Sequence, residues 1–360
     1  MTMNRIDRLR ANLVAKGLDG LLVSDPENRR YLSGFTGSAG YLLITHDSAL
    51  LATDFRYTEQ ATKQAPHFEI SRISKADWLA SLLTEIDIPK LGFESSNVTV
   101  AAYTNLKETL ANSTAKNRVQ LTPAVDLIEP LRAIKSPDEL ALITKAVEIA
   151  DQAYEEVSRT IEIGDTEETV AWRLELAMRE RGAEAIAFDI IVAAGPNGAM
   201  AHHRADQTPI LKGQPVVMDF GARYQGYCSD ITRTICLGGP DEQFRKVYDT
   251  VLGAQLAASA TVESGMTGEQ ADNLARNIIE TAGHGEQFGH SLGHGIGLAV
   301  HEDPRVGPRA TNILENGTIF TIEPGIYIPG WGGVRIEDIV VMEDGRARTL
   351  TMANKRDTPF

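Results

Sequence analysis

Apolar residues recur at the spacing of an α-helix in several segments after residue 135. Ser136-Pro137-Asp138-Glu139 forms a capping box with proline at the first helical position, and helical spacing then continues as far as Val157. Further helices are predicted for 165–182, roughly 241–263 and 268–282. This part of the chain is therefore expected to contain two successive pairs of helices.

Each predicted helix pair is followed by two strand-like runs that flank a turn signal. The first two runs, 216–221 and 228–232, lie on either side of Tyr224-Gln225-Gly226-Tyr227. The other two, 318–325 and 334–340, flank a glycine-rich turn centred on Gly330. The repeated order of helix, helix and hairpin predicts an internal duplication. A further strand is expected over 185–194.

Residues before about 130 alternate between helix and strand signals. A short amphipathic helix that ends near Gly17 is expected to precede a strand at 20–24, and 40–45 with 49–53 indicate a hairpin. We therefore expect an α+β protein of two domains, a smaller α/β domain at 1–132 and a larger domain at 133–360.

The composition of the chain limits the classes of function that this protein can have. The formal net charge of −14, without a basic stripe, argues against a nucleic-acid partner. The sequence has no apolar run of about 20 residues for a membrane span and no secretory signal at its start, so a cytoplasmic protein is expected. Cys228 and Cys236 lie too far apart in one predicted strand to form a disulfide.

Four acidic residues occupy apolar strand-like runs, two in each predicted hairpin. Asp219 and Asp230 lie eleven positions apart, and their midpoint falls on the first turn. Glu323 and Glu337 lie fourteen apart, with their midpoint at Gly330. Each hairpin should therefore bring two carboxylates together, about 5 Å apart on neighbouring strands, where like charges repel. A divalent cation is the candidate that would neutralise them.

Histidines supply the neutral groups of this candidate site. His294 lies between glycines, which let the backbone approach a ligand closely. Two acid pairs with one imidazole suit a binuclear site for manganese, cobalt or zinc. His290, His301 and the adjacent pair His202 and His203 are candidates for proton transfer or oxyanion stabilisation, although each alone could equally be an ordinary hydrogen-bonding side chain.

Two short matches to other catalytic motifs do not hold. Asp219-Phe220-Gly221 spells the metal-binding triplet of protein kinases, but no glycine-rich phosphate loop or His-Arg-Asp loop accompanies it. His301-Glu302 begins like a zincin motif, but Arg305 occupies the position of the second histidine.

With these residues, the chain resembles the metal-dependent proline peptidases, the prolidase and aminopeptidase P group of the pita-bread superfamily. The resemblance is strong over about 136–350 and looser in the N-terminal part. It rests on Met218-Asp219-Phe220-Gly221-Ala222, Ser229-Asp230-Ile231-Thr232-Arg233-Thr234, His290-Ser291-Leu292-Gly293-His294-Gly295, Ile322-Glu323-Pro324-Gly325 and Val334-Arg335-Ile336-Glu337-Asp338. It implies a pseudo-twofold pita-bread domain preceded by a creatinase-like domain, and a homodimer.

The resemblance also implies a role for each matching residue. Two metal ions would be bound, with Asp230 and Glu337 bridging them, Asp219 on one, and His294 and Glu323 on the other. The remaining matches are a proton-handling His202, substrate or intermediate contacts from His290 and His301, a carboxylate-binding Arg305, and Tyr327 and Arg335 around the site. Met200-Ala201-His202-His203 departs from the usual Leu-Pro-His, so His203 is an alternative to His202, although the order favours His202.

The resulting hypothesis is a binuclear metallopeptidase that hydrolyses the bond between an N-terminal residue and proline in a small peptide. Two cations, manganese being typical of the group and cobalt or zinc possible, would share a water, and the resulting hydroxide would attack the carbonyl. Glu323 would act as general base, as the resemblance implies. The compact length and Arg305 favour dipeptides.

Four alternatives differ from this hypothesis. Aminopeptidase P activity would act on longer peptides that begin with Xaa-Pro. A methionine aminopeptidase usually lacks such an N-terminal domain. A creatinase-like metal-free hydrolase or a non-catalytic binding module should have lost metal ligands, whereas all five are present.

Overall fold

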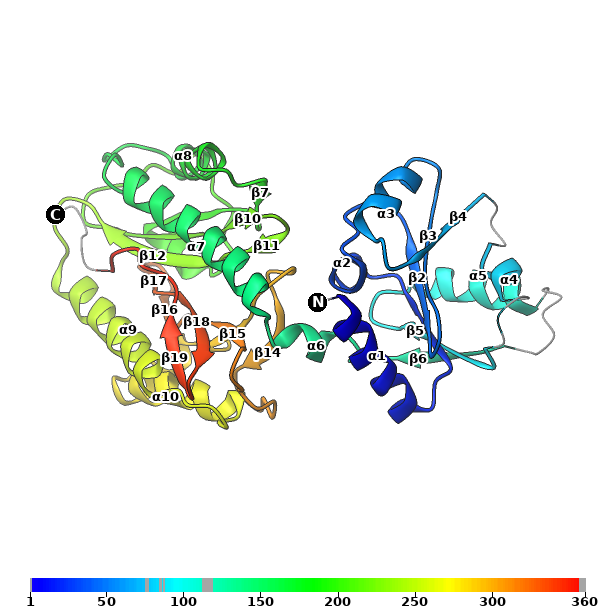
Figure 1. Ribbon diagram of the computed structural model, residues 1–360. Helices are drawn as coiled ribbons and strands as arrows, with labels where there is room; N and C mark the ends of the chain where they lie inside the picture. Colours follow the sequence, from blue (N-terminus) through cyan, green and yellow to red (C-terminus); the bar gives the residue numbers. More distant parts are fainter. Residues whose placement is uncertain (1, 75–77, 84–85, 87, 112–118, 356–360) are drawn as a thin grey trace. The chain divides into compact units, whose positions relative to one another are not determined.

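The computed structural model describes residues 2–74, 78–83, 86, 88–111 and 119–355, and the chain divides into two units, Met1–Arg132 and Ala133–Phe360 (Figure 1). Buried side chains from the described helices and strands form a hydrophobic cluster in the first unit and two such clusters in the second. In the described ranges, no helix combines the length and the apolar character of a membrane span.

Six described strands form one mixed sheet in the first unit. They are β1 (Gly20–Val23), β2 (Tyr41–Thr45), β3 (Ala49–Thr53), β4 (Glu69–Arg72), β5 (Lys90–Glu94) and β6 (Gln120–Ala124). Their order is β4-β3-β2-β1-β5-β6, with β2 and β3 antiparallel and β1 and β5 parallel. The predicted strand at 20–24 and the predicted hairpin are thus confirmed.

Helices accompany this sheet, and the first of them ends where the sequence predicted. They are α1 (Thr2–Lys16), α2 (Pro26–Ser33), α3 (Thr58–Gln64), α4 (Trp78–Leu82), α5 (Val100–Ala111) and α6 (Glu129–Ala133). Leu9 and Leu13 of α1 are completely buried, each worth about 2 kcal/mol of hydrophobic stabilisation. Gly17 follows with a left-handed φ of 64°, which ends the helix.

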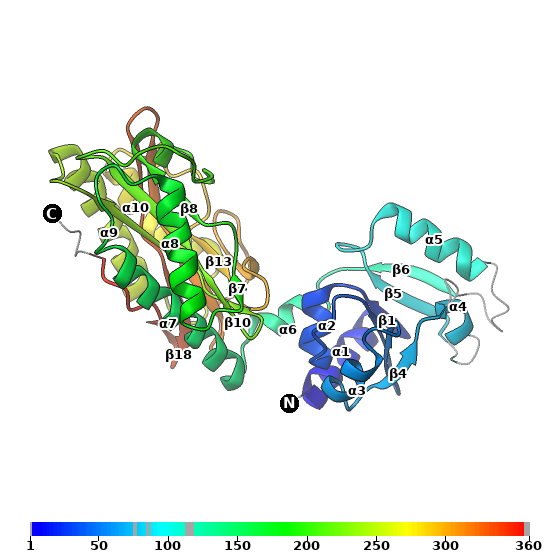
Figure 2. The same ribbon diagram turned by 90° about the horizontal axis from the view of Figure 1, so that it is seen from above.

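The second unit contains the two predicted helix pairs. They are α7 (Pro137–Val157) with α8 (Glu167–Glu180), and α9 (Glu242–Thr261) with α10 (Gly268–Thr281). The predicted capping box is present at Ser136, and a second capping box begins α10 at Thr267. Figures 1 and 2 show α7 beside α8 and α9 beside α10, with the strands of this unit lying along both pairs.

The strands of the second unit lie in several small sheets. They are β7 (Ala185–Ile186), β8 (Ile191–Ala194), β9 (Pro215–Phe220), β10 (Ala222–Tyr224), β11 (Tyr227–Cys228), β12 (Ile231–Cys236), β13 (Gly293–Gly295), β14 (Glu302–Val306), β15 (Ile319–Ile322), β16 (Gly325–Ile328), β17 (Gly332–Arg335), β18 (Asp338–Glu343) and β19 (Arg346–Thr349). The described strands pair in the orders β12-β9-β8, β11-β10-β7, β14-β13-β15-β18-β19 and β16-β17. Two short 3₁₀ helices, Gly195–Ala199 and Gly285–Gln287, complete the described elements.

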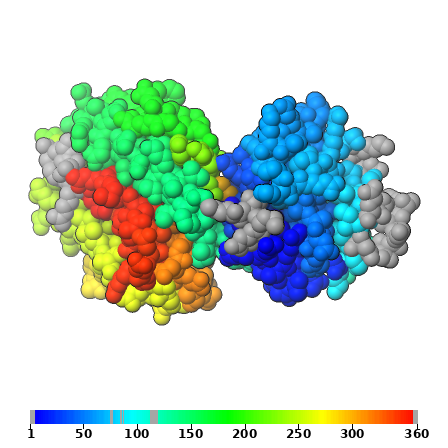
Figure 3. Space-filling model, viewed as in Figure 1, coloured from blue at the N-terminus to red at the C-terminus, as the bar shows by residue number. Residues whose placement is uncertain are grey.

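The duplication is visible in the two cores of this unit. Helices α7 and α8 bury apolar side chains such as Tyr154 and Leu174 against β8, β9 and β12. Helices α9 and α10 bury side chains such as Val251 and Ile279 against β15 and β18. Figure 3 shows the red C-terminal segment, which includes edge strand β19, at the surface of this unit. In each half, the predicted pair of helices therefore packs on the strands of that half and forms one hydrophobic core.

Two local predictions were wrong. The strand expected over 185–194 is split: β7 pairs with β10 and β8 pairs with β9, because the chain crosses between sheets where the Ala187 N–H group bonds the Gly221 carbonyl. Residues 185–194 are apolar except for Asp189, and this pattern gives no sign of such a crossing. Cys228 and Cys236 lie in different strands, β11 and β12, although both are buried free thiols as expected.

Candidate active site

The first acid pair lies in the first predicted hairpin. β9 and β12 are antiparallel, with Asp219 directly opposite Thr232. Asp230 precedes Thr232 by two positions, so it is the diagonal neighbour of Asp219 on the same face rather than its direct partner. Gln225 (φ 45°) and Gly226 (φ 79°) form the turn, and two successive left-handed residues are typical of a type I′ hairpin.

The second acid pair lies in the second predicted hairpin. In β16 and β17, Gly325 is opposite Arg335. Glu323 precedes Gly325 by two positions and Glu337 follows Arg335 by two, so the same register carries the two glutamates opposite one another. The local spacing therefore predicted the glutamate pair as observed, whereas for the aspartates it predicted the shared face but not the diagonal offset.

His294 reaches these carboxylates from β13, and a glycine beside it makes this possible. A Cβ atom on Gly293 would lie 1.9 Å from the Thr321 carbonyl oxygen, so only glycine lets β13 come so close to β15. The backbone N–H group of His294 then donates to Thr321 Oγ1 at 3.1 Å.

The ring of His294 is oriented as a metal ligand. Its Nδ1 atom lies 3.0 Å from the Gly295 carbonyl oxygen, which can only accept, so Nδ1 carries the hydrogen. Nε2 is left with a free lone pair and faces Asp230 Oδ2 at 3.6 Å and Glu323 Oε1 at 3.4 Å. Burial, together with the neighbouring His301, lowers the pKa of His294 to about 4, which keeps the ring neutral and able to bind a metal near pH 7.

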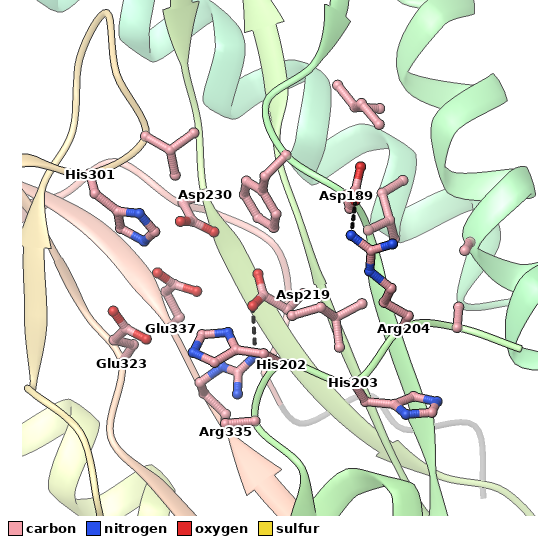
Figure 4. Close-up of a pocket in the computed structure, with 18 of the residues that line it drawn as sticks. Asp189, His202, His203, Arg204, Asp219, Asp230, His301, Glu323, Arg335 and Glu337 are labelled. Carbon is pink, nitrogen blue, oxygen red and sulfur yellow. Dashed lines mark hydrogen bonds and ion pairs between the residues drawn. The ribbon is translucent and has the colours of Figure 1, made fainter. Parts of the chain in front are cut away.

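The acidic side chains and His294 converge in one cavity of about 900 Å³ in the second unit. Figure 4 shows Asp219, Asp230, Glu323 and Glu337 around a common space, with His301 and His202 at its border. The ligating atoms of Asp230, His294 and Glu337 all lie within 4.8 Å of one another. Residues from both halves of the duplication therefore form one site.

Three carboxylate oxygens in this site are buried without a hydrogen-bond partner among the described residues: Asp219 Oδ1, Asp230 Oδ1 and Glu337 Oε1. The second oxygens of two of these groups are satisfied, since Asp219 Oδ2 accepts from Arg335 at 2.6 Å and Glu337 Oε2 accepts from Thr232 at 2.7 Å. Buried carboxylate oxygens are costly unless a hydrogen bond or a cation compensates them. The donor set therefore fits divalent metal ions, which oxygen and imidazole ligands bind well.

Burial and mutual repulsion make the free carboxylates reluctant to ionise. Burial, and then repulsion by Glu337, raises the pKa of Asp230 well above its usual range. Burial likewise raises the pKa of Glu337 well above its usual range and that of Glu323 to about 8. Bound cations would take the place of the protons that these groups otherwise hold.

Arg335 organises the side of the site next to Asp219. It donates to Asp219, to Tyr327 Oη at 2.7 Å and to Thr232 Oγ1 at 3.1 Å. Burial opposes its charge, but Tyr327 and Asp219 more than offset this and raise the pKa of Arg335 above its usual range. Tyr327 Oη in turn lies 2.9 Å from His290 Nε2, which links the arginine to the histidine.

The other predicted site residues lie along the cavity. His202 and His301 are exposed to it, and the His301 ring lies 4.3 Å from the His294 ring between centroids. Arg305 is exposed on the wall, with Nη2 3.4 Å from Ser291 Oγ. His203 instead places Nε2 2.7 Å from Glu167. In Figure 4 its ring points away from the four carboxylates, whereas His202 lies beside them.

Sequence reasoning missed the two threonines that support the acidic ligands. Thr321 donates to Glu323 Oε1 at 3.2 Å, and Thr232 donates to Glu337 Oε2. Thr321 lies two positions before Glu323, on the same face of the chain, so strand alternation could have found it. Thr232 contacts an acid 105 positions away, which no local pattern reveals.

Comparison with known proteins agrees with this geometry. Residues 141–344 match metallopeptidase family M24, and residues 5–134 match the creatinase/prolidase N-terminal domain. The chain belongs to metallopeptidase family M24. The predictions of the family, of its two-part fold and of a hydrolase are therefore confirmed.

Three proteins similar to this chain carry two related names. An Xaa-Pro dipeptidase of Pyrococcus horikoshii is 40% identical over 339 residues, 94% of each chain. The structure of an Xaa-Pro dipeptidase from Bacillus anthracis has a TM-score of 0.95 at 42% identity, covering 99% of each chain. The structure of an X-Pro aminopeptidase from Thermotoga maritima has a TM-score of 0.86 at 36% identity, covering 96% of this chain and 98% of that one.

Proposed function

We propose that this M24 chain is an Xaa-Pro dipeptidase that works with two divalent cations. The observation that carries the proposal is the convergence of four carboxylates and one imidazole in one cavity. Three of the carboxylate oxygens are buried and have no partner among the described residues. The names of the relatives from Pyrococcus horikoshii and Bacillus anthracis support the substrate class.

The charge of the site favours two cations over one. Arg335 forms an ion pair with one of the four carboxylates, that of Asp219, and so supplies one positive charge to the site. One further divalent ion would leave the ionised site with net negative charge in a buried setting, which is unfavourable. Two divalent ions would offset all four carboxylates and leave room for an anionic nucleophile.

The positions of the ligands support the assignment made from the sequence. Asp230 and Glu337 would hold the ions together with His294, since each has a buried oxygen without a partner among the described residues and their ligating atoms lie within 4.8 Å of the imidazole. Asp219 would bind one ion through Oδ1, because Arg335 occupies Oδ2. His294 and Glu323 would bind the other ion, since their ligating atoms lie 3.4 Å apart.

Glu323 is suited to move the protons of hydrolysis. When bound, two divalent cations would lower the pKa of a water molecule between them and polarise the peptide carbonyl. With cations bound in place of its proton, Glu323 would be a carboxylate, which is the form that can accept a proton. Glu323 would accept the proton that the attacking water loses and deliver it to the nitrogen of the leaving proline.

The three histidines divide between substrate contact and support. His290 uses both ring nitrogens on protein groups, since Nδ1 lies 2.7 Å from the Ser291 carbonyl and Nε2 lies 2.9 Å from Tyr327 Oη. It would therefore orient Tyr327. His202 and His301 face the cavity, so we assign to them the contacts with the substrate carbonyl and its developing oxyanion. The pKa of His301 is lowered by burial, which favours a neutral ring that donates one N–H.

Arg305 favours dipeptides among possible substrates. Its guanidinium lies on the cavity wall and would pair with a carboxylate that directly follows the proline. A longer peptide has its carboxylate farther from the scissile bond and would lose this pairing. The similarity to the Thermotoga maritima X-Pro aminopeptidase makes cleavage of longer peptides the second candidate.

Metal analysis combined with hydrolysis of Ala-Pro and Ala-Pro-Ala tests the proposal. We expect two equivalents of bound metal and faster turnover of Ala-Pro. Turnover of Ala-Pro-Ala alone would replace the dipeptidase by the aminopeptidase, and absence of both metal and turnover would refute a metallopeptidase. Manganese as the native metal, a homodimer and a cytoplasmic location stay predictions.

A further inference from the structure

Glu167 is a completely buried carboxylate outside the metal centre. It is the first residue of α8, and its two oxygens accept four hydrogen bonds from one segment of chain. The donors are the Ala194 N–H group at 2.7 Å, Asn197 Nδ2 at 2.9 Å, His203 Nε2 at 2.7 Å and the Asp206 N–H group at 3.2 Å. A buried carboxylate with so many donors fixes the segment that supplies them.

The segment that supplies these donors, residues 194–206, contains His202 and directly follows a strand of the sheet that carries Asp219. It leaves β8, in which Ile191 pairs with the metal-ligand candidate Asp219. On its other side it packs against β17, since a Cβ atom on Gly333 would lie 2.0 Å from the Gly198 carbonyl oxygen. The segment 194–206 is thus held between Glu167 and the second hairpin, and His202 is carried between these supports.

The same cluster is not a second metal site. The candidate ligand atoms of Glu167, His203 and Asp206 lie within 4.8 Å of one another. A carboxylate offers about four lone-pair directions, and those of Glu167 are already used by protein donors. Glu167 therefore holds the segment 194–206 in place and has no oxygen lone pair left for a cation.

We propose that the hydrogen bond between Glu167 and His203 positions His202 for catalysis. His202 and His203 are adjacent, and Figure 4 shows the first beside the carboxylates and the second turned away from them. With His203 fixed on Glu167, the backbone that carries His202 is held in place, and His202 lines the same cavity as His290 and His301. This inference rests on the proposed function, because His202 is taken as a substrate contact.

Variants of His203 test this positioning role without removing the buried carboxylate. His203→Ala should lower kcat for Ala-Pro by about tenfold to a hundredfold, because an error of about 1 Å in a catalytic group costs that much. KM should stay within about threefold of wild type, and the variant should still bind two metal ions. His203→Gln, whose amide can donate to Glu167, should recover most of the lost activity.

A double-mutant cycle with His202→Ala separates positioning from general structural damage. His202→Ala should keep its metals and lose about 10²-fold or more in kcat. If His203 acts through His202, adding His203→Ala should cause little further loss. Equal losses from His203→Ala in both backgrounds, or no rescue by His203→Gln, would overturn the proposal.

Failure of the proposed function gives a different result. If metal-loaded wild-type protein hydrolyses neither Ala-Pro nor Ala-Pro-Ala, the peptidase assignment fails whatever His203 does. A crystal structure of His203→Ala then decides the inference: displacement of the His202 ring from the carboxylates supports it, and an unmoved ring overturns it.

Discussion

Arg335 Nη2 lies 2.6 Å from Asp219 Oδ2, in an ion pair that joins the two acid hairpins across 116 positions of sequence. The two side chains are only 4% and 13% exposed. The pair gives Asp219 one neutralising partner and turns its other oxygen, Oδ1, toward the metal site. It is therefore a contact on which both the folding of the metal-free protein and the geometry of the metal site depend.

Arg335→Met should destabilise the metal-free protein by about 3–5 kcal/mol, because it leaves a buried carboxylate unpaired. Added metal should recover more stability in this variant than in wild type, since a cation replaces the missing partner of Asp219. Denaturant unfolding with and without metal measures both effects. The control Arg348→Met breaks an exposed pair with Glu343 and should change stability by about 1 kcal/mol or less. Equal metal-induced stabilisation of wild type and Arg335→Met would contradict this account.

Asp230→Asn should abolish high-affinity metal binding and peptidase activity, because no neighbouring group can replace a bridging carboxylate. The same change should raise the melting temperature of the metal-free protein, since it removes one of several repelling buried acids. Calorimetry and metal analysis test the two halves separately. Asp249→Asn, on the exposed face of α9, is the control and should alter neither property. An active Asp230→Asn enzyme with two bound metals would rule out the bridging role.

The metal-free protein should lose stability as pH rises from about 5 to about 8.5. The pKa of Glu323 is raised from an ordinary 4.5 to about 8, so the stability it contributes is fully present below pH 4.5 and is lost as pH rises through 8. Asp230 and Glu337 act in the same direction. Metal binding requires the ionised groups, so the increase in melting temperature on adding metal should grow over the same range.

The variant Glu323→Gln isolates this pH effect from other titrating groups. Its metal-free melting temperature should depend less steeply on pH than that of wild type between pH 5 and 8.5, because its side chain cannot ionise. Parallel curves for the two proteins would show that Glu323 does not titrate in this window.

Arg305→Met should raise KM for Ala-Pro by about tenfold or more, because a charge-assisted hydrogen bond usually contributes at least that much to binding. The effect on kcat should be smaller. Ala-Pro amide, which lacks the carboxylate, should be hydrolysed equally by wild type and variant. Arg245→Met, an exposed change on α9, serves as the control. An equal rise in KM for Ala-Pro and its amide would mean that Arg305 does not bind the substrate carboxylate.

Much of the fold was predictable from the chain alone because its signals are local. The capping boxes at Ser136 and Thr267 begin helices in the structure, and the two turns set the strand register by short-range geometry. The positions of the acids relative to the two turns then decide which carboxylates share a face of each hairpin. The break in 185–194 was not predictable, because it depends on which sheet each half joins.

The sequence by itself determined the two acid pairs, since hairpin register is fixed within a dozen or so residues. Only the tertiary structure brought the pairs together with His294, placed Arg335 against Asp219 and separated His202 from His203. These contacts join segments from 36 to 116 positions apart and form only when the helices and strands of each half have packed into their core. No pattern of neighbouring residues specifies the distance between side chains that meet in this way.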